Sequence, residues 1–214
     1  LYTSFRILNK WYSSLQADWE VDKPCDNSLI ARGKMYQLDL TQIWKIELTG
    51  KHEIKLDIEI ESVSPLDIQE GYVNMMLTPE YTHWCTALED GDFPPIIETD
   101  KDWISLLGDN TAKRSVGIDR EGISEKAIPS LVFQYLKSSF PCYSQILNSD
   151  YLSNCRVLQY KVTGLQNFSN NHGEAFAYFS GKIIIGDFSA RHYLEKLQDN
   201  FTLKDGKSKL IFDY

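Results

Sequence analysis

Three acidic residues at alternating positions have a spacing that could perform chemistry. Asp57, Glu59 and Glu61 stand two residues apart, so a β-strand would place all three carboxylates on one face. Such a row can bind the metal ions that catalyse the cleavage of triphosphates. That chemistry also needs inward arginines or lysines to hold the phosphates, whereas we expect Lys45 to pair with Asp57, and Glu47 with Lys55, across a hairpin. We therefore interpret the three carboxylates as charges that face solvent.

His83 and Cys85 form the one close pair of a histidine with a cysteine in the sequence, and both types can bind a metal or take part in nucleophilic catalysis. A structural zinc site needs four ligands, and no other histidine or cysteine stands at a recognisable spacing from this pair. A nucleophilic cysteine needs a neighbouring base, which the sequence does not place. The patterns GxSxG, HExxH and GxxxxGKS/T are absent. We therefore assign no catalytic residue, no cofactor and no metal ligand, and the sequence favours a binding protein over an enzyme.

The charge balance narrows the classes of partner. The chain has 214 residues, with 22 Lys and Arg against 30 Asp and Glu, a net charge of -8 and a pI near 5.0. Nucleic-acid-binding domains usually carry a basic face, so this balance argues against a nucleic-acid partner. No apolar run reaches the roughly 18 residues of a transmembrane helix. The first residue is Leu1 rather than Met, so we expect further residues upstream in the full protein.

The cysteines predict the cellular compartment. They are widely and irregularly spaced, without a CxxC pair. We expect them to be reduced, buried apolar side chains of an intracellular protein. A secreted protein with two disulfides is the alternative, to which glycosylation triplets at Asn167 and Asn200 would belong. The four cysteines are Cys25, Cys85, Cys142 and Cys155.

An amphipathic helix is predicted over residues 1–22. Apolar residues recur there at alternating spacings of four and three, which is the pattern of a coiled-coil seam. Pro24 would end the helix. We expect this helix either to pack on the core or to end a coiled coil that begins upstream. The apolar positions are Leu1, Phe5, Leu8, Tyr12, Leu15 and Trp19, with Ile7 and Trp11 widening the stripe.

A β-hairpin is predicted over residues 44–61, because apolar and charged residues alternate on both sides of Gly50. One register places apolar residues opposite each other on one face and opposite charges on the other. A slip by one residue would turn every apolar side chain outward. The expected pairs are Leu48 with Ile54, Ile46 with Leu56, Trp44 with Ile58, Glu47 with Lys55, and Lys45 with Asp57.

The remaining elements complete an α+β prediction. Strands over 29–40 and 72–77 would join the hairpin in an antiparallel meander of about four strands within residues 23–90. Residues 91–123 are expected to form a loop-rich connection with a short helix near 99–107. Residues 124–214 would form a mixed α+β half, either as a separate domain or as part of the same one, with about two to three helices and as many strands. Its elements are a helix at 128–136, strands at 157–162 and 175–185, a helix after Ser189 and a last strand at 210–212.

The expected order is an N-terminal helix, an antiparallel meander, a loop containing Pro79 and then helices. This order resembles that of RWD-type modules, which scaffold proteins with coiled-coil stems often carry. The resemblance implies a scaffold function, and it offers two tandem RWD-like lobes as an alternative fold. Further proteins of the same assembly would then be the partners.

Aromatic residues supply the candidate binding surface, because Trp and Tyr are enriched where proteins bind each other. Tyr81 and Trp84 stand in a loop bounded by prolines. We expect a non-catalytic interaction or scaffold module of a multi-subunit assembly. A small-ligand-binding or hydrolytic domain with a pocket between sheet and helices is one alternative, and a secreted recognition domain is another. The candidate partner-binding residues are Leu1, Phe5, Leu8, Trp11, Tyr12, Leu15, Trp19, Tyr81 and Trp84.

Overall fold

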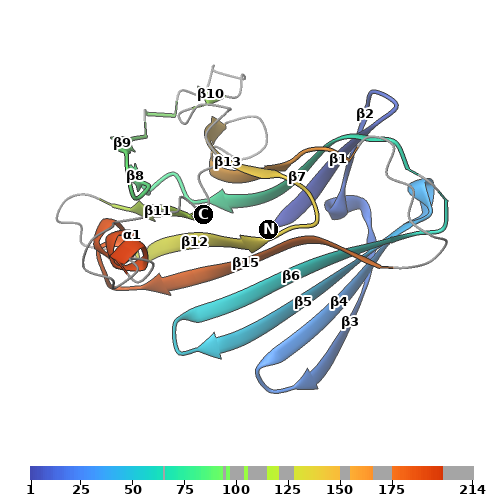
Figure 1. The fold of residues 1–214 in the computed structure, drawn as a ribbon, viewed down its shortest axis with the longest axis horizontal. Helices are drawn as coiled ribbons and strands as arrows, with labels where there is room; N and C mark the ends of the chain where they lie inside the picture. The colour runs from blue at the N-terminus through green and yellow to red at the C-terminus, as the bar shows by residue number, and fades with distance from the viewer. Residues whose placement is uncertain are drawn as a thin grey trace, which may run out of the picture.

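Two antiparallel sheets packed face to face form the fold in the computed structural model (Figure 1). Among the described residues there is one α-helix, close to the C-terminal end of the ordered elements. The structure describes residues 1–64, 66–93, 95–96, 104–105, 115–120, 128–149, 155–165 and 175–199.

The smaller sheet has six strands, and every neighbouring pair in it is antiparallel. It combines strands from both ends of the chain, so neither end forms this sheet alone. Its order is β10 (Ile104–Ser105), β13 (Cys142–Ser149), β14 (Cys155–Val162), β7 (Ile68–Leu77), β1 (Tyr2–Ile7) and β2 (Lys10–Ser13).

The larger sheet has nine antiparallel strands and begins with a meander of four strands that follow one another in sequence. The last strand of the described part, β15, then lies between β6 and β12. Two short 3-10 turns, η1 (Ser14–Gln16) and η2 (Tyr36–Leu38), connect strands near the start of this sheet. The order is β3 (Asp18–Cys25), β4 (Ser28–Met35), β5 (Leu40–Gly50), β6 (Glu53–Ser62), β15 (Phe176–Gly186), β12 (Ser130–Lys137), β11 (Ser115–Asp119), β8 (His83–Cys85) and β9 (Asp90–Asp92).

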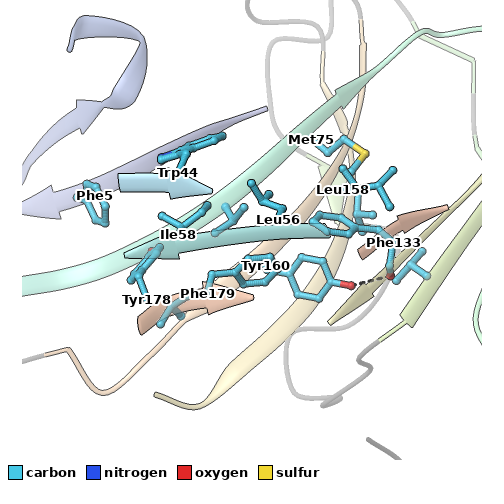
Figure 2. Close-up of a cluster of buried hydrophobic side chains, with 14 of the residues drawn as sticks. Phe5, Trp44, Leu56, Ile58, Met75, Phe133, Leu158, Tyr160, Tyr178 and Phe179 are labelled. Atoms are coloured by element: carbon cyan, nitrogen blue, oxygen red, sulfur yellow. Dashed lines mark hydrogen bonds between the residues drawn. The ribbon is translucent and has the colours of Figure 1, made fainter. Parts of the chain in front are cut away.

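An aromatic cluster fills the space between the sheets (Figure 2). Phe133 packs edge to face against Tyr160, with ring centroids 4.9 Å apart. Phe179 adds a third ring, and Phe5 packs on Tyr178. The Tyr160 hydroxyl donates a 2.9 Å hydrogen bond to the carbonyl of Phe133. Because Tyr160 and Phe133 lie on different sheets, this bond joins the two layers.

The helix α1 (Ala190–Asp199) covers part of the outer face of the larger sheet. Ala190 and Leu194 pack there with Cys85 and with strands β12 and β15. A Cβ atom on Gly117 would lie 2.7 Å from the Cβ of Ala190, so the close approach of the helix requires glycine at this position. The backbone N–H of His192 bonds to the hydroxyl oxygen of Ser189 at 3.3 Å. The predicted helix after Ser189 and its cap are confirmed.

The predicted hairpin is confirmed with its register. Every expected pair is present: Leu48 with Ile54, Ile46 with Leu56, Trp44 with Ile58, Glu47 with Lys55, and Lys45 with Asp57. The predicted strands at 72–77, 157–162 and 175–185 correspond to β7, β14 and β15. The predicted strand at 29–40 corresponds to β4 only as far as Met35, after which the turn η2 leads into β5. Strand β7 belongs to the other sheet, however, and the fourth strand of the meander is β3.

The predicted N-terminal helix is wrong, and so are the coiled coil and the α+β class that depended on it. Residues 1–22 contain β1, β2, η1 and part of β3 instead. Leu8 and Asn9 have φ values of 50° and 61°, which are those of a two-residue hairpin turn between β1 and β2. The apolar residues at alternating spacings of four and three therefore lie on strands and a turn rather than along one helix. The likeness to RWD-type modules, single or tandem, fails with the same elements.

A second predicted helix is also wrong, because residues 130–137 form β12. Leu131 and Phe133 of this strand face the core, while Val132 is buried under α1 on the opposite face. A strand buried on both faces loses the alternation that distinguishes it from a helix. The predicted helix at 99–107 contains strand β10 at Ile104–Ser105, and its other residues lie outside the described part. The predicted strand at 210–212 lies outside it as well.

Candidate binding surface

The inward face of the larger sheet loses its cover toward the tips of two hairpins. Along β5, Leu40, Gln42 and Trp44 are buried, Ile46 is half-buried, and Leu48 is 52% exposed. All five face the same side, because side chains alternate along a strand. The hairpins β3–β4 and β5–β6 extend away from the six-stranded sheet (Figure 1). The inward side chains near their tips therefore continue the core pattern without a second layer of described residues above them.

Strands β3 and β4 extend the same uncovered face. Trp19 and Val21 lie opposite Gly33 and Ala31 of β4, and these in turn lie opposite Gln42 and Trp44 of β5. Trp19 is 37% exposed and Val21 is 62% exposed. Leu29 of β4 lies opposite Ile46 and is half-buried. We call this surface the overhang, and define it by five inward side chains: Trp19, Val21, Leu29, Ile46 and Leu48.

Trp19 is fixed at the inner end of the overhang. Its indole N–H donates a 3.0 Å hydrogen bond to the carbonyl of Ser14. Its ring packs edge to face on Trp44, with centroids 5.6 Å apart. The ring also lies over Gly33, where a Cβ atom would come within 2.7 Å of it. The aromatic surface at this position is therefore held in one orientation.

A buried polar network joins the base of the overhang to the other sheet. The Thr3 hydroxyl on β1 donates a 2.7 Å hydrogen bond to the amide oxygen of Gln42. The indole N–H of Trp44 donates to the same oxygen at 3.0 Å. The backbone N–H of Thr3 donates to the Ser14 hydroxyl oxygen at 2.9 Å. Because buried polar bonds of this kind are costly to break, β5 leaves the core as a fixed extension.

The outer face of the same strands carries a stripe of opposite charges. Asp18 and Glu20 of β3 lie opposite Lys34 and Arg32 of β4. Asp22, two residues further, completes the acidic row on β3. In the described part of the chain β3 pairs with β4 alone, and all eight of its residues are exposed. This strand is therefore an edge with an apolar inward side and an acidic outward side.

A separate polar cluster lies on the outer face of the smaller sheet. The Arg6 guanidinium contacts the Glu70 carboxylate at 2.7 Å, and the Tyr72 hydroxyl donates to the same carboxylate. The hydrogen bond from Tyr72, with that from Arg6, holds the pKa of Glu70 below its usual value. Trp11 packs on Tyr72 with ring centroids 5.7 Å apart and is 54% exposed. The charged groups of this cluster are bonded to one another.

The structure divides the sequence-predicted binding residues into two groups. Phe5, Tyr81 and Trp84 are buried, and the Tyr81 hydroxyl donates to the carbonyl of Pro129 at 2.8 Å. Tyr12 is half-buried against the core. The candidate residues that are exposed lie on different elements and form no common face. Leu8 and Trp11 lie on the β1–β2 hairpin, whereas Trp19 lies on the overhang. Exposed large side chains among them are Leu1, Leu8, Trp11, Leu15 and Trp19.

Sequence reasoning missed Val21, Leu29 and Leu48 as surface residues. Leu48 was placed in the correct hairpin register, but its partner layer was assumed to be present. Val21 was hidden inside the predicted helix. The alternation of Trp19 and Val21 with Asp18, Glu20 and Asp22 is the signal that could have identified a strand there.

The groups with possible chemistry are bonded to neighbours. Asp57 contacts Lys55 at 2.8 Å and accepts a hydrogen bond from Ser180, while Lys45 contacts Glu59. His83 lies 3.1 Å from the Asp92 carboxylate. Burial, reinforced by the Asp119 carboxylate, raises the pKa of the Cys85 thiol to about 12, which keeps it protonated at neutral pH. Within the described ranges, no group of three or more His, Cys, Asp or Glu side chains could hold a metal ion.

The described residues include no helix with the length and apolar character that would cross a membrane. No known protein family matches this chain. A search of curated proteins finds none with significant similarity to it.

Proposed function

We propose that this chain is a non-catalytic protein-interaction module that binds other proteins through the overhang. One observation carries the proposal: inward residues of β3 and β5 that continue the core pattern are exposed, with Val21 62% and Leu48 52% accessible to solvent. Contiguous exposed apolar surface is typical of protein-binding sites. The fixed position of Trp19 supports the same proposal, because rigid aromatic residues bind at a low cost in conformational entropy.

The direct test uses charged substitutions on the overhang. We expect Val21→Asp with Leu48→Asp to abolish the capture of protein partners from an extract of the source cell, read by mass spectrometry. The matched control is Val63→Asp with Leu88→Asp, which alters two other exposed apolar residues, 70% and 57% accessible. Both variants should keep the wild-type circular dichroism spectrum, because exposed substitutions rarely unfold a protein. Equal capture by both variants would refute the proposal.

We also propose an intracellular location, supported by the four cysteines, none of which forms a disulfide in the structure, and of which Cys25 is exposed. Thiols persist in reducing compartments. Titration of the unfolded, unreduced protein with a thiol reagent should therefore find all four cysteines free. A protein purified from its source with two cysteine pairs oxidised would assign it to the secretory route instead.

A further inference from the structure

Strand β3 exposes unpaired backbone groups as well as apolar side chains. A strand at the edge of a sheet has N–H and C=O groups on its outer side that can pair with another strand. Strand β3 is eight residues long, pairs with β4 alone in the described part of the chain, and is exposed throughout. Pro24 and the register shift between Asp22 and Cys25 interrupt the edge near its end. The unpaired side is therefore open over residues 18–22, and it adjoins the overhang.

The charged residues on this edge determine which charge a strand that pairs with it should carry. Proteins usually protect an edge by pointing a charged side chain inward, which blocks any further strand. Over residues 18–22 the inward positions hold Trp19 and Val21, and the charges of Asp18, Glu20 and Asp22 point outward; Lys23 comes after this stretch, where the register shifts. The inward side therefore accepts apolar side chains from a further strand. The outward side repels an acidic strand and attracts a basic one.

The same charges exclude a second copy of this chain as the occupant. Antiparallel pairing of β3 with another β3, with inward sides matched, would place Glu20 opposite Glu20 and Asp18 opposite Asp22, or a neighbouring acidic combination. Every such register joins like charges, which is destabilising. Strand β4 shows the favourable alternative, because its Lys34 and Arg32 lie opposite Asp18 and Glu20.

We propose that β3 binds an extended segment of a partner protein by strand addition, and that apolar and basic residues alternate in that segment. This inference rests on the proposed function, for which it names the chemistry of the partner. The apolar residues of the segment lie beside Trp19 and Val21 and widen the overhang. Its lysines or arginines lie opposite Asp18, Glu20 and Asp22. The segment runs antiparallel to β3, as every other neighbouring pair in both sheets does.

Three synthetic peptides as long as β3 test the partner's chemistry. One alternates valine with lysine, one alternates valine with glutamate, and one is a scrambled version of the first. Fluorescence anisotropy should detect binding of the alternating basic peptide only, and added salt should weaken it. Hydrogen exchange of the bound protein should show new protection of the β3 amides.

Charge reversal on the edge supplies the matched variants. Glu20→Lys with Asp22→Lys should lower the affinity for the basic peptide by about tenfold and should allow the acidic peptide to bind. Glu80→Lys with Asp187→Lys makes the same change in net charge at two exposed acids elsewhere. Because this control leaves β3 unchanged, it should lower the affinity for the basic peptide far less. An equal loss of affinity in both variants would show that only the net charge of the protein matters, which would overturn the proposal.

Cys25 reports the direction of the bound strand, because it is exposed at the end of β3. A basic peptide with an activated mixed disulfide at one terminus can exchange with the Cys25 thiolate, which releases the activating thiol. Antiparallel binding places the N-terminus of the peptide next to Cys25, so the N-terminally activated peptide should react faster. Cys25→Ser should abolish the trapping. Faster trapping of the C-terminally activated peptide would refute the antiparallel arrangement.

The outcomes separate this inference from the function on which it rests. Absence of peptide binding, equal binding of both charge types or unprotected β3 amides would refute strand addition by a basic segment. The overhang as a protein-binding surface would still stand if Val21→Asp with Leu48→Asp abolishes partner capture. Dimerisation of the wild-type protein in sedimentation experiments would identify a second copy as the occupant and overturn the inference.

Discussion

Tyr178 buries a hydroxyl group that has no hydrogen-bond partner among the described residues. It reaches from β15 across the core toward Gly71 of β7, where a Cβ atom would come within 2.5 Å of the hydroxyl oxygen. Burial raises the pKa of this phenol well above its usual value. A buried polar group without a partner loses its interaction with water and gains nothing in return.

Removing this hydroxyl should stabilise the protein. We expect Tyr178→Phe to raise the free energy of unfolding by about 1 kcal/mol, because it removes the buried polar atom and keeps the ring that packs on Phe5. Urea titration followed by circular dichroism measures the change. Tyr160→Phe is the control, and it should destabilise, because the Tyr160 hydroxyl donates to the Phe133 carbonyl. A loss of stability in Tyr178→Phe would indicate a hydrogen bond at this hydroxyl.

Buried thiol and phenol groups with raised pKa values should make the folded state less stable at high pH. Burial raises the pKa of Cys85 from its usual 9.0 to about 12, and it also raises the pKa values of Tyr160 and Tyr178. In the unfolded chain these groups ionise at lower pH than in the folded protein. The stability they confer is therefore complete below pH 9 and is lost as the pH rises toward 12.

Urea titrations at pH 7, 9 and 11 check this dependence, with little change expected between pH 7 and pH 9 and a decrease between pH 9 and pH 11. Cys85→Ala should reduce the decrease between pH 9 and pH 11, because it removes the thiol whose ionisation favours the unfolded state. A profile that is flat up to pH 11 would contradict the burial of these groups.

The hairpin β5–β6 could be predicted from the sequence because its information is local. Alternation on both strands and one turn fix its register, and each pair lies close in sequence. The element β12 could not be predicted, because its burial on both faces comes from α1, about sixty residues later. The overhang was missed for the same reason: local alternation gives the face of Leu48, but only the extent of the other sheet determines whether that face is covered.

The turn between β1 and β2 carries backbone strain. Leu8 adopts a φ of 50°, a backbone conformation that is unfavourable for a leucine and acceptable for asparagine. Its side chain is 77% exposed and contributes little packing. We expect Leu8→Asn to stabilise the protein by about 1 kcal/mol, measured as an increase in the thermal midpoint. Leu8→Val should lower that midpoint, because a β-branched residue tolerates this conformation least.

At the scale of the whole molecule, charge decides whether copies of this chain associate. With a net charge of -8 and an acidic edge on β3, the protein should sediment as a monomer at neutral pH. Mixing it with the Glu20→Lys, Asp22→Lys variant should produce a heterodimer, because opposite charges then meet across the two β3 edges. Sedimentation velocity of each protein alone and of the mixture measures this. A dimer in the wild-type sample, or none in the mixture, would contradict it.

The position of β15 has a consequence for how the molecule is made. Asp57 of β6 and Ser180 of β15 are bonded although they stand 123 positions apart, and β15 lies between β6 and β12. Translation delivers β6 and β12 first, so a nascent chain holds two open strand edges until residues 176–186 leave the ribosome. Pairing between distant segments is slow to form, and open edges recruit other strands. The larger sheet can therefore close only after residues 176–186 have been made, and until then β6 and β12 each have an edge that a wrong strand could occupy.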